Sequence, residues 1–306
     1  DFLVLGPTIG NAKLTQQQAL RPLGAHKVAW IARRHGYNAL AISKLQILSE
    51  DEIVEICSKF VGPKTLIGIS TSLLALPNIG SPRQATTDFT VLDTFVNAVK
   101  RIRQRYNNKI LLGGQIAHKF KEMFNADYIM DGLSVENDIA KFLDLHFRNG
   151  IQRKPYDWHI TTCDFKWEET DFIQEYEALP IETSRGCIFK CKFCTYSEIG
   201  RKKGTFEKDI NILRDYLVEN YEKYKVTRYT LADDTFNDDD ERMNEWCDML
   251  ETLPFKVKYG GYVRLDLFER YQETAKRLYN NGLRGCSFGL ETFHPGAAKV
   301  IGKSFS

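Results

Sequence analysis

The feature that most constrains the fold is a regular alternation of short apolar runs with longer amphipathic segments along the first half of the chain. The apolar runs are Phe2–Leu5, Ala39–Ile42, Leu66–Ile69, Ile110–Leu112 and Tyr128–Met130. Helical patterns lie between them, at about residues 22–35, 50–60, 87–106, 116–124 and 134–147. Buried strands separated by helices are typical of an open parallel sheet, which binds ligands at the carboxyl ends of its strands. Residues 1–147 are therefore predicted to form a flavodoxin- or Rossmann-like α/β domain.

A second series of the same kind follows an interruption. Residues 148–178 contain a glycine, a proline, two tryptophans and a group of acidic residues, and we interpret them as a linker. Strands are then predicted at 181–183, 228–231, 256–260 and 286–290, and helices at about 206–223, 238–251 and 268–281. Four such units over residues 179–306 predict a partial (β/α) barrel, which normally contains further units. Because the chain starts without methionine and stops at Ser306, we expect a fragment whose barrel is truncated at the carboxyl end.

Charge and hydropathy exclude several classes of partner. The formal net charge is +2, so nothing indicates a nucleic-acid partner. No apolar run approaches the roughly 20 residues that a membrane helix needs, and no secretory signal opens the chain. We therefore expect no membrane partner and a cytoplasmic location. Three of the seven cysteines fall within eight residues, which in a reducing compartment indicates metal ligation rather than disulfides.

The clustered cysteines are Cys187, Cys191 and Cys194, and they directly follow a predicted strand. Three thiolates on one loop can bind three irons of a cubane cluster, which leaves the fourth iron open to a substrate or cofactor. Structural zinc usually requires four protein ligands, and no fourth stands nearby. The spacing therefore predicts a 4Fe–4S cluster. Zinc-binding or incidental cysteines are the alternative.

The stretch from Glu182 to Tyr196 resembles the cluster loop of the radical S-adenosylmethionine superfamily. This resemblance implies that S-adenosylmethionine chelates the open iron and is cleaved reductively to a 5′-deoxyadenosyl radical, which abstracts hydrogen from the substrate. It implies an enzyme that takes electrons from a donor such as flavodoxin or ferredoxin and acts on a small-molecule or peptide substrate. It also places Phe193 near the adenine.

Four further positions match the superfamily in order along the chain. Asp233 and Asp234 follow the second barrel strand and resemble a motif that receives the cofactor's ammonium; helix capping is the alternative reading. Arg264 follows the third strand, where it would pair with the cofactor carboxylate or lie on the surface. Glu291 follows the fourth strand and resembles the residue near the ribose or methionyl end.

The amino-terminal half resembles the cobalamin-binding domain that precedes the radical barrel in one large subfamily. Small residues at Ser70, Ser72, Gly113 and Gly114 would let a large flat cofactor approach the backbone. The Asp-x-His-x-x-Gly motif of other cobalamin proteins is absent, so a bound cobalamin would lack that histidine ligand. The alternative is a degenerate domain that binds substrate or covers the barrel.

Three functions remain open at this point. The first is a cobalamin-dependent radical methyltransferase that modifies an unactivated centre. The second uses the same radical without cobalamin, for rearrangement, cyclisation or sulfur insertion. The third is a non-catalytic iron–sulfur protein, which would need no cofactor-binding residues beyond the cysteines.

Overall fold

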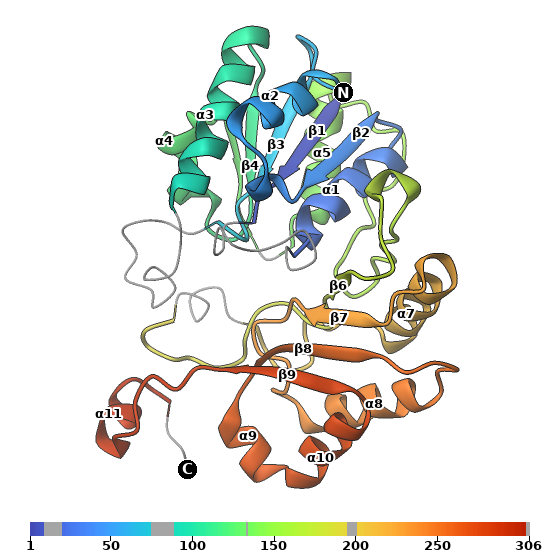
Figure 1. Ribbon diagram of the computed structural model, residues 1–306, viewed down its shortest axis with the longest axis vertical. Helices are drawn as coiled ribbons and strands as arrows, with labels where there is room; N and C mark the ends of the chain where they lie inside the picture. The colour runs from blue at the N-terminus through green and yellow to red at the C-terminus, as the bar shows by residue number, and fades with distance from the viewer. Residues whose placement is uncertain (9–19, 75–88, 133, 195–200, 304–306) are drawn as a thin grey trace. The chain divides into compact units, whose positions relative to one another are not determined.

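The fold is taken from a computed structural model, in which the chain divides into two compact units (Figure 1). The structure describes residues 1–8, 20–74, 89–132, 134–194 and 201–303. The amino-terminal unit comprises Asp1–Trp158 with Phe165–Ile173, and the carboxyl-terminal unit comprises His159–Asp164 with Gln174–Ser306. Residues 148–178, predicted as a linker, thus contribute to both units.

The amino-terminal unit contains a five-stranded parallel sheet in the order β2-β1-β3-β4-β5. Its strands are β1 (Phe2–Gly6), β2 (Ala39–Ser43), β3 (Leu66–Ser70), β4 (Ile110–Gly113) and β5 (Tyr128–Met130). This is the flavodoxin-like order, and it confirms the predicted open parallel sheet. Gly6 pairs with Ser43 and Ser70 pairs with Gly113, so the carboxyl ends of these strands share one edge.

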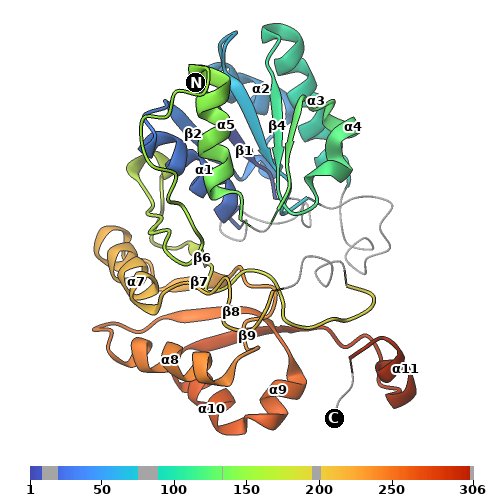
Figure 2. The same ribbon diagram turned by 180° about the vertical axis from the view of Figure 1, so that it is seen from behind.

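Helices cover both faces of this sheet (Figures 1 and 2). They are α1 (Leu23–Arg34), α2 (Glu50–Ser58), α3 (Phe89–Tyr106), α4 (Lys121–Phe124) and α5 (Glu136–Arg148), with 3₁₀ turns η1 (Leu45–Ile47), η3 (Ala117–Phe120) and η4 (Glu169–Asp171). Helices α2, α3 and α4 pack on one face, and α1 and α5 pack on the other. Between α3 and the sheet lies an apolar core that includes Leu5, Ile69 and Phe95.

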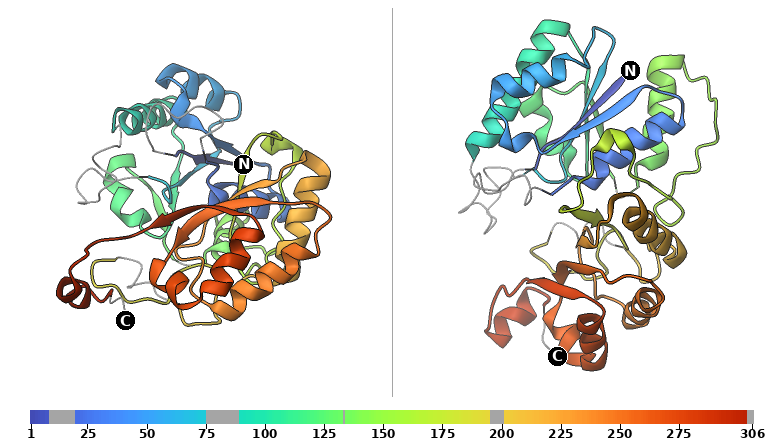
Figure 3. Two further views of the ribbon diagram at one scale, coloured as in Figure 1. Left: turned by 60° about the horizontal axis from the view of Figure 1, so that its bottom comes forward. Right: turned by 45° about the vertical axis from the view of Figure 1, so that its right-hand side comes forward.

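The carboxyl-terminal unit contains a four-stranded parallel sheet in the order β6-β7-β8-β9 (Figure 3). Its elements are β6 (Ala178–Ile181), α7 (Ile210–Tyr224), β7 (Arg228–Leu231), α8 (Asp240–Glu251), β8 (Lys258–Val263), α9 (Leu265–Arg270), α10 (Gln272–Asn280), β9 (Leu283–Phe288) and α11 (Pro295–Val300). Strands that neighbour each other in chain order are the arrangement of successive (β/α)-barrel units. Among the helices that the structure describes in either unit, none is long and apolar enough to cross a membrane.

Several element boundaries differ from the sequence prediction: β6 lies at Ala178–Ile181 instead of 181–183, and β8 at Lys258–Val263 instead of 256–260. Two further differences have a local cause. The helix predicted at 268–281 is two helices, because the backbone of Tyr271 (φ −116°, ψ 62°) leaves helical geometry between α9 and α10. Strand β9 begins at Leu283, three residues earlier than predicted. Gly282 precedes it with φ +104°, a conformation that glycine adopts readily and that lets the chain turn directly from α10 into the strand.

Candidate functional site

The cysteine loop leaves the carboxyl end of β6 and is closed at its base by backbone pairing. Ser184 forms an antiparallel bridge with Glu207, and the Lys208 N–H donates to the Thr183 carbonyl at 2.9 Å. The outgoing chain after β6 and the returning chain before α7 therefore run side by side. All three cysteines lie between these two points.

Asp233, directly after β7, fixes the first residues of this loop. Its carboxylate accepts the backbone N–H groups of Thr183 (2.8 Å) and Ser184 (2.9 Å), together with the hydroxyl groups of both residues. The side chain is buried, which raises the pKa of Asp233 to about 7 against the opposing effect of these donors. Asp233 thus anchors the loop, and its predicted contact with the cofactor ammonium stays a prediction.

The next two residues contact the beginning of the cysteine motif. Asp234 Oδ2 accepts the Gly186 N–H at 3.0 Å, and the Thr235 hydroxyl lies 3.3 Å from Cys187 Sγ. Asp234 is half-buried, unlike Asp233. The end of β7 therefore supplies one carboxylate that anchors the loop and a second, more accessible one beside the cysteines.

Arg201 is a site residue that sequence reasoning missed. Its buried guanidinium donates to both Asp238 oxygens (2.7 and 2.9 Å) and to Glu207 (2.7 Å). It also reaches the Gly186 carbonyl (3.3 Å) and the Ser184 hydroxyl (3.4 Å), so it ties the end of the loop to its start. Burial raises the pKa of Asp238 to about 6, although Arg201 opposes the shift. An isolated arginine between lysines and a glycine carries no sequence signal for such a role.

The three cysteines form a donor set suited to a cubane cluster. Cys191 is buried, Cys187 and Cys194 are half-buried, and the Cys194 N–H donates to the Cys191 carbonyl at 3.0 Å. Within the described ranges, no three His, Cys, Asp or Glu side chains are gathered closely enough to hold a metal ion. The set nevertheless fits the cluster chemically, because all three thiols lie on one anchored loop and polar groups, the Thr235 hydroxyl and the Arg264 guanidinium, approach two of the sulfurs. Such hydrogen bonds tune iron–sulfur clusters.

Arg264, at the end of β8, provides the second of these sulfur contacts. Its Nη1 lies 3.9 Å from Cys191 Sγ, and its guanidinium carbon lies 3.9 Å above the centre of the Phe189 ring. Asp266 accepts two hydrogen bonds from Arg264, at 2.6 and 2.9 Å. The predicted Arg264 therefore lies at the cysteine loop, with its charge paired to a neighbouring carboxylate.

Lys303 links two other predicted positions, Glu291 and Phe193. Its Nζ lies 2.6 Å from Glu291 Oε2 and 5.9 Å from the centre of the Phe193 ring. The preceding turn also contacts the loop, because the Ile301 carbonyl accepts the Lys192 N–H at 2.9 Å. The segment after α11 thus brings Glu291 and Phe193 towards the same ammonium group.

In the amino-terminal unit, the predicted cobalamin contacts lie where β3 and β4 end. The Thr71 N–H donates to the Gly113 carbonyl at 2.8 Å and joins the two turns. Gly114 has φ +141°, and a Cβ there would overlap the Thr71 hydroxyl and crowd Ser72. At Gly113, by contrast, a Cβ would meet no described atom within 4 Å. Backbone is therefore approachable at this edge, as a flat cofactor requires.

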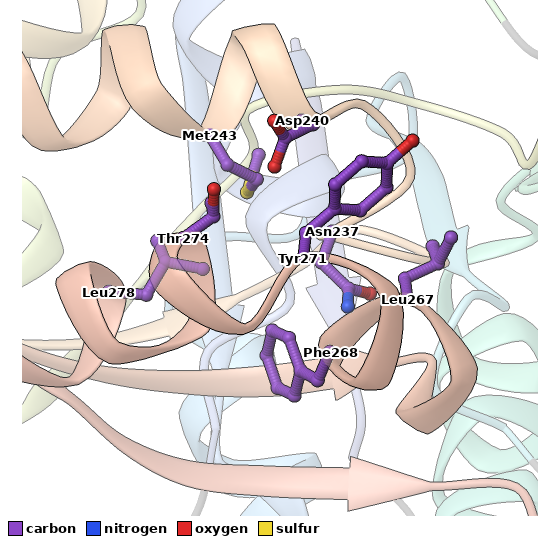
Figure 4. Close-up of a pocket in the computed structure, with 8 residues that line it drawn as sticks. All are labelled: Asn237, Asp240, Met243, Leu267, Phe268, Tyr271, Thr274 and Leu278. Atoms are coloured by element: carbon purple, nitrogen blue, oxygen red, sulfur yellow. The ribbon is translucent and has the colours of Figure 1, made fainter.

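The carboxyl-terminal unit also contains a small pocket, which is lined by residues other than those of the cysteine loop and its contacts (Figure 4). It has a volume of about 10 Å³ and is lined by residues of α8, α9 and α10 together with Asn237 and Tyr271. That volume holds about one water molecule. It contains none of the predicted site residues and is no candidate for a cofactor.

Comparison by sequence identifies a relative of low identity. No family model matches the chain. The chain is 24% identical over 329 residues to the uncharacterized methyltransferase PH0819 of Pyrococcus horikoshii, covering 100% of this chain and 68% of that protein.

Two solved structures of the cobalamin-dependent S-adenosylmethionine radical enzyme OxsB resemble the chain. The form with aqua-cobalamin matches with a TM-score of 0.65 at 15% identity, and the form with aqua-cobalamin and S-adenosylmethionine with 0.64 at 17%. Each match covers 99% of this chain and 45% of OxsB, so the chain spans less than half of that enzyme's length. The resemblance predicted from the sequence is thereby confirmed in the fold: over nearly its whole length, this chain has the fold of a cobalamin-dependent radical S-adenosylmethionine enzyme.

Proposed function

We propose that this chain is a radical S-adenosylmethionine enzyme in which Cys187, Cys191 and Cys194 hold a 4Fe–4S cluster. The observation that carries the proposal is the anchoring of this cysteine loop on the carboxyl ends of β6 and β7. Catalytic groups of (β/α) barrels gather at that end of the strands. A zinc site would require a fourth ligand. A three-thiol set with an open iron requires none.

The surrounding residues suit the binding of S-adenosylmethionine. When bound and reduced, the cluster supplies the electron that cleaves the cofactor to methionine and a 5′-deoxyadenosyl radical. Asp234 accepts the cofactor's ammonium, and Arg264 holds positive charge beside the cluster and the methionyl carboxylate. Phe193 packs near the adenine. Glu291 gives up its ion pair with Lys303 and binds the ribose or methionyl end of the cofactor instead.

We further propose that the amino-terminal unit binds cobalamin and that the reaction is methyl transfer to an unactivated carbon or phosphorus. The flavodoxin-like strand order and the open backbone at Gly113 support binding at the edge that carries Ser70, Ser72 and Gly114. The relative described as a methyltransferase and the aqua-cobalamin in OxsB point the same way. Flavodoxin or ferredoxin is the proposed electron donor, and the substrate is a small molecule or peptide.

Anaerobic reconstitution of the full-length protein, followed by cofactor analysis, tests the proposal. We expect about four irons and four sulfides per chain, and a corrinoid spectrum that survives desalting after incubation with hydroxocobalamin. Cys191→Ala should lose the cluster, whereas Cys286→Ala, an exposed cysteine on β9, should retain it. A Cys191→Ala protein that still holds four irons would refute the ligand set. Loss of corrinoid from a cluster-loaded protein would instead favour the cobalamin-independent reactions.

A further inference from the structure

A buried hydrogen-bond relay of three side chains in the amino-terminal unit ends at the carboxyl edge of the sheet, where β3 and β4 also end. His26, on α1, lies with Nδ1 2.6 Å from Asp171 Oδ1 and with Nε2 3.1 Å from the hydroxyl of Ser43. The side chains of His26 and Asp171 are each 1% exposed. Trp167 packs on the imidazole, with the ring centres 4.9 Å apart. Neither the cluster nor the predicted cobalamin contacts account for this relay.

The ionisation states of His26 and Asp171 determine which group donates and which accepts in each hydrogen bond of the relay. Burial lowers the pKa of His26, so the imidazole is neutral at pH 7. Burial alone would raise the pKa of Asp171, but the bonds from His26 and from the Glu168 N–H (2.9 Å) outweigh it, and the carboxyl is ionised. A carboxylate only accepts, so His26 carries its proton on Nδ1 and presents a lone pair at Nε2. Ser43 must therefore donate its proton inward.

Because the Ser43 hydroxyl proton is donated to His26, the hydrogen-bonding role left to Ser43 is restricted. Ser43 is the last residue of β2 and is paired with Gly6, at the carboxyl edge where Ser70 and Gly113 also end. Its side chain is half-buried, and in the described part of the chain His26 is the hydroxyl's only partner. With its proton directed at His26, the oxygen can only accept a further hydrogen bond.

We propose that Ser43 is a ligand-binding residue at this edge, held by His26 and Asp171 as an obligate acceptor for an amide N–H of the corrinoid. This inference rests on the proposed binding of cobalamin to the amino-terminal unit. Cobalamin carries carboxamide groups around its ring, and their N–H groups need acceptors of fixed orientation. Ser43 is the binding residue, whereas His26 and Asp171 are positioning residues that act through it.

A purely structural role is the competing explanation, since the relay also ties η4 to α1. Asp171→Asn separates the two explanations. The Glu168 N–H requires an oxygen acceptor at residue 171, so the new amide would turn its NH₂ group towards His26 Nδ1. His26 would then carry its proton on Nε2 and donate to Ser43, whose own O–H would turn outward. The tie between η4 and α1 persists, but Ser43 changes from acceptor to donor.

The experiment titrates hydroxocobalamin into the full-length protein by absorbance and determines the His26 tautomer by ¹⁵N NMR of histidine-labelled protein. We expect an Nδ1–H tautomer in the wild type and an Nε2–H tautomer in Asp171→Asn. Ser43→Ala should weaken corrinoid binding roughly tenfold, the effect of one hydrogen bond. Asp171→Asn should weaken it at least as much, whereas Ser43→Thr should restore binding. Thr94→Ala, which removes an exposed hydroxyl from α3, is the matched control and should bind normally.

The outcomes separate this inference from the proposed function. A wild type that binds no corrinoid would overturn both. A wild type that binds corrinoid, with Ser43→Ala binding equally well, would overturn the role of Ser43 alone. An Nε2–H tautomer in the wild type would also overturn it. If Asp171→Asn fails to fold, the comparison of Ser43→Ala with Ser43→Thr decides the question.

Discussion

Replacing Arg201 by methionine tests whether its buried ion pairs hold the cysteine loop. The side chains of Arg201 and Asp238 are 2% and 4% exposed, and the substitution leaves Asp238 and the partly exposed Glu207 without their cation. Breaking a buried pair in this way costs about 3–5 kcal/mol. Arg277→Met is the matched control, because its partners Asp248 and Glu251 are largely solvent-exposed. Exposed pairs contribute about 0–1 kcal/mol.

The effect of Arg201→Met should depend on pH in a direction set by Asp238. In the wild type, burial raises the pKa of Asp238 from 3.8 to about 6, so its contribution to stability falls as pH rises through that interval. Without Arg201 this pKa rises further, and the loss continues to higher pH. The deficit of the variant should therefore be smaller near pH 5, where Asp238 is largely protonated in both proteins, than at higher pH. It should reach its full size near pH 8.

Hydrogen exchange of the metal-free protein, read on peptides covering residues 183–187 and 201–208, measures this deficit locally. We expect protection to fall in both peptides at pH 8, after correction for the intrinsic exchange rate, while Arg277→Met leaves both unchanged. Adding Asp238→Asn to Arg201→Met should recover part of the protection. A deficit that is the same at pH 5 and pH 8, or one smaller than that of Arg277→Met, would refute the reasoning.

Two further predictions concern the cofactor sites. Asp234→Ala should weaken binding of S-adenosylmethionine roughly ten- to a hundredfold, because a hydrogen bond to a charged group contributes about 1.5–3 kcal/mol. Isothermal titration of a variant with unchanged iron content measures the affinity. An unchanged affinity would limit the role of Asp234 to its hydrogen bond with Gly186. Gly114→Ala should destabilise the amino-terminal unit by about 1 kcal/mol or more, because φ is +141° and the Cβ would overlap Thr71. Thermal unfolding compared with Gly113→Ala, where the Cβ position is open, measures the difference, and equal melting temperatures would contradict it.

The sequence was sufficient to predict the elements of the fold because each depends on local pattern. Apolar runs located strands in both sheets, and amphipathic periodicity located most helices. The break at Tyr271 was missed because apolar periodicity continues through a single non-helical residue. Strand order was not predictable from periodicity, since it depends on which crossovers pack best, and the order β2-β1-β3-β4-β5 emerged only from the structure.

The candidate site could be predicted from the sequence where its functional residues lie close together in the chain. The three cysteines lie within one short motif, and Asp233 and Asp234 directly follow a strand. Contacts between distant residues leave no such mark: Asp171 is 145 positions from His26. Arg201 likewise contacts Asp238, which lies 37 positions further along the chain, only when the loop is closed. In the sequence, a buried charged residue cannot be distinguished from a solvent-exposed one until the partners of the buried residue are known.

Formation of 5′-deoxyadenosine tests the central claim most directly. Reconstituted full-length protein, reduced by dithionite or flavodoxin, should convert S-adenosylmethionine to 5′-deoxyadenosine and methionine in equal amounts, measured by liquid chromatography and mass spectrometry. Cys187→Ala, Cys191→Ala and Cys194→Ala should each abolish the product, while Cys286→Ala should form it at the wild-type rate. A wild-type protein that carries four irons yet makes no 5′-deoxyadenosine, or a Cys191→Ala protein that still makes it, would contradict the account.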